Sequence, residues 1–277
     1  METNELPSIL ELNKEYFNNE SSKYDSHPTH YLCAKKCAEA ILKEVEDFED
    51  LEGSEVLDFA YLCAHVKSIL GVDLSQNMVD EYNKKVWQQG IDQEEMHAIC
   101  LELKESEGNQ LNGRKFDLVV CASAYHHIED INSMTRVLAN YLKQDGTLIV
   151  LDLKKQPNLS HRLHMDTNNS VSHKGGFDPK ELENIFLETG MLKDVGSKIA
   201  FTFSKSNEKD KEHTFSKCNE KDKNEHTFSK CNEKDKNEHT FSKCNEKDKN
   251  EHTFSKCNEK DKKELTFEYF LVKGKKI

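Results

Sequence analysis

Apolar runs and amphipathic segments alternate along most of this chain. A short apolar run bounded by turn residues predicts a buried strand, and apolar residues three or four positions apart predict a helix. The predicted strands are residues 55–59, 66–74, 96–103, 116–122 and 147–153. The predicted helices are residues 29–46, residues 77–89 behind the cap Ser75, residues 130–143 stopped by Gly146, and residues 179–190 behind the cap Asp178. Strands that alternate with helices in this way are typical of a parallel sheet covered by helices.

A polar repeat interrupts the last part of the chain. Units such as TFSKCNEKDKNEH recur with a period of 13 residues. Each unit has one Phe as its only large apolar residue, so burial cannot offset an ordering entropy of roughly 1–2 kcal/mol per residue. The flanks KIAFTFSK and ELTFEYFLVKGKK are strand patterns. We therefore expect a hairpin joining roughly 195–205 to 264–273. We also expect residues 206–263 to be a flexible insertion in the loop of this hairpin, and residues 1–205 with 264–277 to form the folded domain.

The charge balance narrows the class of partner. The net charge is −12, whereas a surface that binds nucleic acid or an anionic membrane needs clustered Lys and Arg. No apolar run approaches the roughly 18–20 residues of a membrane span. The first residues are acidic and include no apolar stretch, unlike a signal peptide. We therefore expect no nucleic-acid partner, no membrane contact, and a cytoplasmic or nuclear location.

The nine cysteines raise the question of disulfides or a metal. Five lie in apolar stretches as small buried hydrophobes, and four occupy one position of the repeat. They are Cys33, Cys37, Cys63, Cys100 and Cys121, then Cys218, Cys231, Cys244 and Cys257. Without a secretory signal, reduced thiols are favoured. Zinc sites use spacings such as C-x-x-C, which the repeats lack, and His213 lies five residues before Cys218. We therefore expect no metal.

Four segments of the chain carry a family resemblance. EVLDF, GVDLSQNMVDEYNKK, FDLVVCASAYHHIED and LKQDGTLIVLDL, in this order, resemble the successive motifs of class I S-adenosylmethionine (SAM) dependent methyltransferases. GIDQEEMHAICLEL and SHKGGFDPKELENIFLETG are similar to the small-molecule branch related to the ubiquinone-biosynthesis type. The resemblance covers about residues 20–205 and 264–275. It implies an α/β fold with a Rossmann-like, doubly wound, mostly parallel sheet and a terminal antiparallel hairpin. It also implies SAM as cofactor and a small-molecule methyl acceptor.

The resemblance implies roles at the carboxyl ends of the strands, where doubly wound sheets bind ligands. Asp73 closes the second predicted strand and would accept the ribose hydroxyls of SAM; the alternative is an exposed turn acid. Glu102 closes the third, where the family has an acid near the adenine amino group. Asp58 of EVLDF and the backbone at Ala122 are further cofactor-binding candidates. Tyr24 would lie in a cap that folds over the cofactor.

Histidines follow the fourth predicted strand. His126 and His127 are the catalytic candidates, because a histidine near the transferring methyl can orient the acceptor or remove its proton. Histidines at this place can instead only shape the pocket. His173 lies on a loop that would reach the acceptor or stay in solvent. Alignment of acceptor and methyl would supply much of the catalysis, since the sulfonium is already a strong electrophile.

The first glycine-rich motif of the family, with its helix, is missing. The chain reads VLDFA-YLCAH-VKSILGVD, so only Tyr61 to His65 separate the first two predicted strands, without a glycine. A parallel crossover needs about a dozen residues. We therefore expect a truncated first crossover, and expect that the two strands cannot be full-length parallel neighbours. The leading function is a SAM-dependent methyltransferase whose activity is in doubt. The alternative is a non-catalytic methyltransferase-like protein, either a decayed paralogue or an interaction scaffold.

Overall fold

The computed structural model describes six segments of the chain. They are residues 7–45, 53–57, 66–107, 110–156, 171–205 and 265–277. Asp58, the segment Tyr61 to His65, and the repeat insertion 206–263 lie outside these residues.

The centre of the fold is a seven-stranded sheet in the order β3-β2-β1-β4-β5-β7-β6. The strands are β1 (Glu55–Leu57), β2 (Ser68–Asp73), β3 (Met96–Cys100), β4 (Phe116–Ala122), β5 (Leu142–Leu153), β6 (Leu192–Lys205) and β7 (Leu265–Lys276). β1 to β5 pair in parallel, and β7 runs antiparallel to β5. The strand order changes direction between β1 and β4: β2 and β3 follow on one side of β1, and β4 and β5 follow on the other. This arrangement confirms the predicted α/β class, with a mostly parallel, doubly wound sheet.

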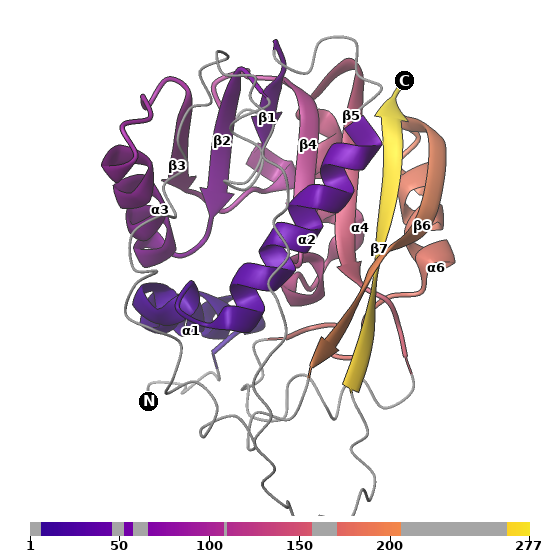
Figure 1. The fold of residues 1–277 in the computed structure, drawn as a ribbon. Helices are drawn as coiled ribbons and strands as arrows, with labels where there is room; N and C mark the ends of the chain where they lie inside the picture. The colour runs from indigo at the N-terminus through magenta and orange to yellow at the C-terminus, as the bar shows by residue number, and fades with distance from the viewer. Residues whose placement is uncertain (1–6, 46–52, 58–65, 108–109, 157–170, 206–264) are drawn as a thin grey trace, which may run out of the picture. The chain divides into compact units, whose positions relative to one another are not determined.

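Helices cover both faces of the sheet. The longer ones are α1 (Ile9–Tyr24), α2 (Pro28–Val45), α3 (Gln76–Gln88), α4 (Ile131–Asn140) and α6 (Pro179–Glu188), and the short ones are η2 (Glu105–Glu107) and η3 (Tyr125–His127). In the view of Figure 1, α2 crosses in front of the strands, whereas α4 and α6 lie behind them. Buried residues of α4 and α6, including Leu138 and Phe186, share one core cluster with the strands. Side-chain caps fix the starts of four helices, because Ser8, Ser75, Asp130 and Asp178 each accept a backbone N–H.

Helix α1 was not predicted, because its apolar pattern is weak. A capping box starts it, in which Ser8 accepts the Glu11 N–H and the Glu11 carboxylate accepts the Ser8 N–H. Further support comes from contacts with α3 and its cap, more than fifty residues further along the chain, and from contacts of Asn13 and Phe17 with His127.

Two element ends differ from the prediction. The helix predicted to reach Lys143 ends at Asn140, and β5 begins at Leu142, which is buried opposite Phe116. The strand then bulges, and a side chain at Gly146 would come within 3.0 Å of the Phe116 and Asp117 carbonyl oxygens. Only glycine allows this close approach, so Gly146 belongs to a strand bulge rather than to a helix stop.

Strand β3 ends at Cys100 instead of Leu103. Its neighbour β2 ends at Asp73, which lies opposite Cys100, and the last contact is the Leu101 N–H donating to the Asp73 carbonyl. Beyond that residue no strand remains to pair with. Glu102 therefore does not close β3 but lies in the segment that follows it.

The first two strands are parallel neighbours despite the short connection between them. Glu55, Val56 and Leu57 pair with residues 68–70 of β2. Among the described residues the pairing covers three residue pairs, and the last two positions of the predicted strand, 58 and 59, lie outside them.

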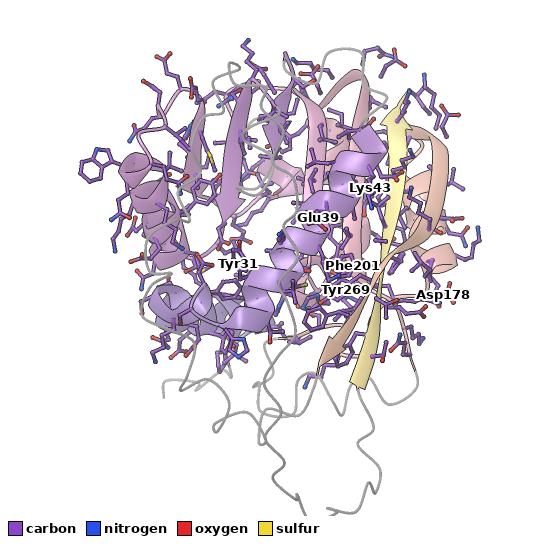
Figure 2. The ribbon with its side chains drawn as sticks, viewed as in Figure 1. Tyr31, Glu39, Lys43, Asp178, Phe201 and Tyr269 are labelled. Atoms are coloured by element: carbon purple, nitrogen blue, oxygen red, sulfur yellow. The ribbon has the colours of Figure 1, made fainter. Side chains whose placement is uncertain are left out.

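The predicted terminal hairpin is confirmed, since β6 and β7 are neighbours at one edge of the sheet. Phe201 of β6 and Tyr269 of β7 stack with ring centroids 4.7 Å apart (Figure 2). The flanks of the repeat therefore form adjacent strands.

We expect deletion of residues 214–252, three exact units of the repeat, to leave the melting temperature of the domain almost unchanged. A polar segment of this composition has too little apolar surface to stabilise the strands beside it. Thermal unfolding followed by circular dichroism is the measurement. A fall of more than about 4 °C, roughly 1 kcal/mol for a domain of this size, would show that the repeats pack.

An ion-pair cluster holds α2 against the terminal hairpin. The Glu44 side chain is only 5% exposed and pairs with Lys198 of β6 and, at 3.0 Å, with Lys273 of β7. Burial alone would raise the pKa of Glu44, but the hydrogen bonds and charges of the two lysines outweigh it and lower the pKa. The carboxylate is therefore the form that stabilises the docked helix.

We expect Glu44→Gln to lower the free energy of unfolding by about 1–2 kcal/mol at pH 7, a modest loss because both lysines are half exposed to solvent. The folded pKa is depressed, so this contribution is present above pH 4.5, the ordinary value, and is lost as the pH falls through the folded value. Urea unfolding at pH 7 and pH 3.5 measures it. Glu39→Gln, at an exposed position of the same helix, is the control (Figure 2). Equal losses in both variants, or a loss independent of pH, would contradict the assignment.

Candidate functional site

The carboxyl ends of the parallel strands meet at one edge of the sheet, and α1 lies across that edge (Figure 1). β2 ends at Asp73, β4 at Ala122 and β5 at Leu153. In doubly wound sheets, ligands bind at this edge beside the switch in strand order, here between β1 and β4. The candidate site is therefore built from strand ends, η3 and the two N-terminal helices.

Asp73 is half-buried at the end of β2, as the sequence predicts. Its Oδ1 atom accepts the Ser75 N–H at 2.7 Å. Burial raises the pKa of this carboxyl, and hydrogen bonds from the Ser75 and Leu74 amides partly offset the rise. The carboxylate is thus held by the backbone in one orientation, which suits a group that receives hydroxyl donors.

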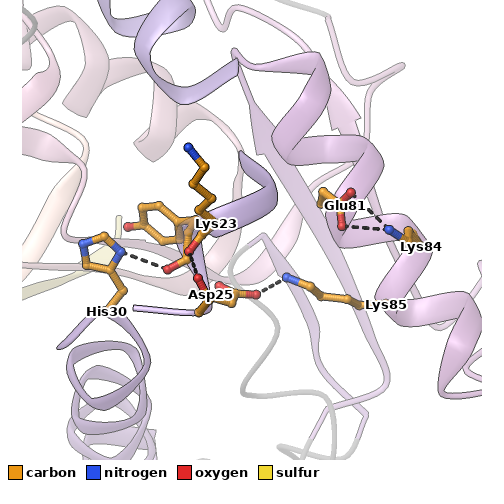
Figure 3. Close-up of polar contacts among 8 residues, drawn as sticks. Lys23, Asp25, His30, Glu81, Lys84 and Lys85 are labelled. Carbon is orange, nitrogen blue, oxygen red and sulfur yellow. Dashed lines mark hydrogen bonds and ion pairs between the residues drawn. The ribbon is translucent and has the colours of Figure 1, made fainter. Parts of the chain in front are cut away.

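Helix α1 is fixed to α3 by side chains at two points. The Asn18 Oδ1 atom accepts the Ser75 hydroxyl at 2.7 Å, and Asn77 Nδ2 donates to the Asn18 carbonyl at 2.9 Å. At the C-terminal cap of α1, Asp25 pairs with Lys85 in the last turn of α3 (Figure 3). Because Ser75 also donates its N–H to Asp73, the same short segment positions both the acid and the helix that lies over it.

Tyr24 is the last residue of α1 and is largely buried. Its ring lies 4.4 Å from that of His30, whose Nδ1 donates to the Tyr24 carbonyl at 3.0 Å (Figure 3). Burial raises the pKa of the Tyr24 hydroxyl to about 12, and nearby negative charges, including that of Asp73, add to the rise. The structure therefore brings two of the cofactor-binding candidates, Tyr24 and Asp73, within electrostatic range of each other.

Glu102 is placed less favourably. Its carboxylate pairs with Lys104 at 3.0 Å and is substantially exposed, while its carbonyl accepts the Gln110 side-chain amide at 2.6 Å. A ligand that uses this acid must compete with Lys104.

The end of β4 holds its backbone in a strained conformation. Ser123, directly after Ala122, has a φ of 54°, in the left-handed region that non-glycine residues rarely adopt. Its N–H donates to the Leu151 carbonyl of β5 at 2.8 Å, which keeps it there. Such strain persists where the surrounding structure imposes it and is concentrated at functional sites.

His126 forms a buried pair with Asp152 of β5. The His126 Nδ1 atom lies 2.8 Å from Asp152 Oδ1, and the His126 N–H donates to Asp152 Oδ2 at 3.2 Å. His126 is 7% exposed and Asp152 is 0% exposed. Burial would lower the pKa of His126, but the charge and hydrogen bond of Asp152 outweigh burial and raise it. Conversely, burial would raise the pKa of Asp152, yet its contacts with His126 hold it below the ordinary value.

His127 and His173 have mainly positioning contacts. The His127 ring lies 4.2 Å from that of His126 and meets the Phe17 ring of α1 edge-on at 5.3 Å. His173 donates from Nε2 to the Ile128 carbonyl and from its N–H to the His126 carbonyl, both at 2.9 Å. The loop that carries His173 is thus bound to the segment after β4 and helps hold the histidine pair in place.

Several residues of the site were not predicted. Asp152 had a visible signal, an acid inside the apolar run TLIVLDL. Cys33 and Cys37 were interpreted as buried hydrophobes, but Cys33 is half-buried with polar neighbours and Cys100 is exposed. Cys37 Sγ lies 3.9 Å from the Ser123 hydroxyl. The spacing of four residues on one helix indicated that the two thiols share a face, but not what they face.

The described residues hold no evident metal site, since no three of their His, Cys, Asp or Glu side chains are grouped to hold an ion. None of the helices in the described segments is long and apolar enough to span a bilayer.

Comparison with known proteins identifies a methyltransferase domain. The sequence profile of a methyltransferase domain family matches residues 54–148. The uncharacterized methyltransferase C1347.09 of Schizosaccharomyces pombe is 39% identical over 163 residues, covering 54% of this chain and 57% of that protein. The uncharacterized methyltransferase YcgJ of Bacillus subtilis is 26% identical over 88 residues, 32% of this chain and 33% of that protein. The chain thus matches little more than half the length of the first relative and a third of the second.

Solved methyltransferase structures share the fold. Magnesium protoporphyrin IX methyltransferase (ChlM) of Synechocystis PCC 6803 with bound SAM has a TM-score of 0.53 at 16% identity, covering 70% of this chain and 92% of that one. A candidate methyltransferase of Bacillus halodurans C-125 has a TM-score of 0.50 at 16% identity, covering 85% of this chain and 97% of that one. At such identities the likeness establishes the fold, and the sequence matches point to the family. Residues 54–148 thus match a methyltransferase domain family, and the chain has the fold of class I SAM-dependent methyltransferases.

Proposed function

We propose that this chain binds SAM and transfers its methyl group to a small-molecule acceptor. One observation carries the proposal: the half-buried Asp73 carboxylate at the end of β2, oriented by the Ser75 amide and lying near Tyr24. A carboxylate at this strand end can accept hydrogen bonds from both ribose hydroxyls. The fold brings that acid to the edge where doubly wound sheets bind their ligands.

The described residues fit the adenosine half of SAM. Asp73 would bind the ribose, Tyr24 would cover it, and Glu102 would receive the adenine amino group if Lys104 releases it. The strained backbone at Ala122 and Ser123 would line the methionine part. Asp58 remains a candidate for the same part of the site.

The acceptor side would use the His126–Asp152 pair. An ionised carboxylate only accepts hydrogen bonds, so Asp152 fixes a proton on His126 Nδ1. The negative charge of Asp152 also makes the imidazole more basic. SAM supplies the electrophilic methyl when bound; His126 would take the acceptor proton, and His127 would orient the acceptor. Phe17, in contact with His127, helps enclose this region, which favours a small acceptor over a macromolecule.

A specific observation favours a second candidate, the non-catalytic methyltransferase-like protein. No glycine lies between Ala60 and Val66, where the family's backbone receives the carboxylate end of SAM. Without those amide donors we expect SAM affinity to be weak. A scaffold that has lost the cofactor altogether would show no saturable binding in the millimolar range.

The test is SAM binding by the full chain and by Asp73→Asn, followed by calorimetry and by ligand-observed NMR. We expect weak binding by the natural chain and a loss of about tenfold or more in the variant, because the amide replaces one charged acceptor by a neutral one. Glu188→Gln, an exposed acid on α6, should bind like the natural chain. Equal affinity in Asp73→Asn would remove the ribose role, and no saturation by any of the three would favour the scaffold.

A further inference from the structure

We propose that the turn between α1 and α2 forms a second binding site, which takes a small protonated amine with a flat apolar body. The site is a cavity of about 320 Å³ whose lining includes Tyr16, Glu20, Lys23 and Tyr24 of α1 with His27 and His30 beside the start of α2. Tyr24 also belongs to the SAM-binding candidates, whereas the other lining residues have no role in the proposed methyl transfer. The test of this site uses no SAM, so it succeeds or fails independently of the proposed function.

Three rings of the cavity form a continuous stack. The His27 and His30 rings have centroids 4.6 Å apart and an interplanar angle of 28°, and the His30 ring lies 4.4 Å from the Tyr24 ring at 31°. The hydrogen bond of 3.0 Å from His30 Nδ1 to the Tyr24 carbonyl keeps the imidazole in the stack (Figure 3). Rings held in this way offer a flat, largely apolar surface in a fixed position, which suits a flat apolar group.

Helix α1 contributes the charge of the cavity. Tyr16, Glu20 and Tyr24 are spaced four residues apart and therefore share one face of the helix. Glu20 is half-buried, and in the described part of the chain its carboxylate has no hydrogen bond or ion pair. Lys23 also lines the cavity, but it is exposed, and in the view of Figure 3 its side chain extends away from His30. The half-buried carboxylate is thus available to a cation from solution.

Negative charge dominates around the two phenols of the cavity. Burial raises the pKa of the Tyr16 hydroxyl, and the charge of Glu20 raises it further. Burial likewise raises the pKa of Tyr24 to about 12, and the negative charges that add to the rise include that of Asp73. Both phenols therefore stay neutral, in surroundings that oppose a further negative charge. The same surroundings favour a cationic ligand over a carboxylate or a phosphate.

These groups together define the class of ligand. A protonated amine would donate charge-assisted hydrogen bonds to Glu20 and gain from the negative faces of the tyrosine rings. Its flat apolar body would lie against the stacked imidazoles. A quaternary ammonium could use the rings but has no N–H to donate to the carboxylate. The volume of the cavity is at the lower end of small-molecule pockets, about 300–1,000 Å³, which favours a compact ligand.

The first experiment measures binding of three probes of nearly equal shape to the full-length natural chain, by calorimetry and ligand-observed NMR. The probes are benzylammonium, benzyl alcohol and benzoate. We expect saturable binding of benzylammonium with a Kd of about 1 mM or lower, a reasonable affinity for so small a ligand. The neutral alcohol should bind about tenfold more weakly or worse, and benzoate should not saturate. Equal binding of amine and alcohol, tighter binding of benzoate, or no saturation by the amine overturns the proposal.

A matched pair of variants tests the carboxylate. Glu20→Gln keeps the shape of the side chain and removes its charge, so benzylammonium should bind about tenfold more weakly while benzyl alcohol is unaffected. Glu15→Gln removes an exposed acid of the same helix that does not line the cavity, and should bind like the natural chain. Equal losses in the two variants would show a general attraction to an acidic surface in place of a site.

A second pair of variants tests the rings. Tyr16→Leu removes one phenol ring from the cavity and should weaken benzylammonium about threefold or more. Tyr31→Leu removes an exposed ring of α2 outside the cavity and should leave the affinity unchanged (Figure 2). Thermal unfolding of each variant establishes that the domain is folded. Unchanged affinity in a folded Tyr16→Leu, or a larger loss in Tyr31→Leu, would place the amine elsewhere on the protein and contradict the assignment.

Discussion

Insertion of a glycine-containing loop and a helix after Ala60 is expected to increase SAM affinity by about a hundredfold or more. The sequence offers no glycine from Tyr61 to His65, so we expect the methionine half of the cofactor to lack the amide donors of a helix N-terminus. Each charge-assisted hydrogen bond to a carboxylate contributes about 1.5–3 kcal/mol, and two of them correspond to at least two orders of magnitude in Kd. Calorimetry on the natural and extended chains measures the difference.

The control for this experiment is an insertion of the same length without glycine and with the helix broken by proline. It should bind SAM no better than the natural chain, because length alone adds no donors. Micromolar binding by the unmodified chain would mean that another segment replaces the loop, and the enzyme would then need no repair. A loop-bearing chain that gains no affinity would count against the SAM site as we propose it, including the role of Asp73.

Breaking the His126–Asp152 pair should have the largest effect on stability. His126→Ala leaves the fully buried Asp152 without its charge partner, which should cost about 3–5 kcal/mol and lower the melting temperature by roughly 10 °C. His97→Ala, at a less buried histidine of β3, is the matched control and should stay within about 1 kcal/mol. The double variant His126→Leu with Asp152→Leu should recover part of the loss, since it leaves no buried charge unpaired.

The pH dependence of that loss follows from the two pKa shifts. The pKa of His126 is raised above 6.5, so its contribution is fully present below pH 6.5 and is lost as the pH rises through the folded value. The pKa of Asp152 is lowered below 3.8, so its contribution is present above pH 3.8 and is lost as the pH falls through the folded value. The difference between the natural chain and His126→Ala should therefore be largest between about pH 4 and 6.5. A constant difference from pH 4 to 9 would show that the pair is uncharged in the fold.

Local signals in the chain predicted much of the fold. The strand at 116–122 was predicted to the residue, because a continuous apolar run bounded by polar residues has few other solutions. The starts of α3 and α6 followed from Ser75 and from Asp178 with Pro179, because a cap satisfies amides only two or three residues away. Asp73 was likewise expected at the end of its strand. Each of these features depends on groups that are close in sequence.

Features that depend on a distant partner were missed or misplaced. β3 stops where β2 stops, which displaced Glu102 from the strand end, and β5 starts early because Leu142 is buried opposite Phe116. α1 has a weak pattern and is held by contacts between Asn18 and α3.

The candidate site was predicted only in part for the same reason: its side chains are paired across strands that are far apart in sequence. His126 was named from its place after a strand, but its raised basicity comes from Asp152, 26 residues away on the neighbouring strand. Cys37 of α2 and Ser123 after β4, whose side chains lie 3.9 Å apart, are likewise 86 residues apart in the chain and meet only through the packing of α2 against the strand ends. An amphipathic pattern or a cap predicts whether a residue is buried or where a helix begins. The pairing of distant side chains depends on strand order and register, which are set only when the whole sheet forms.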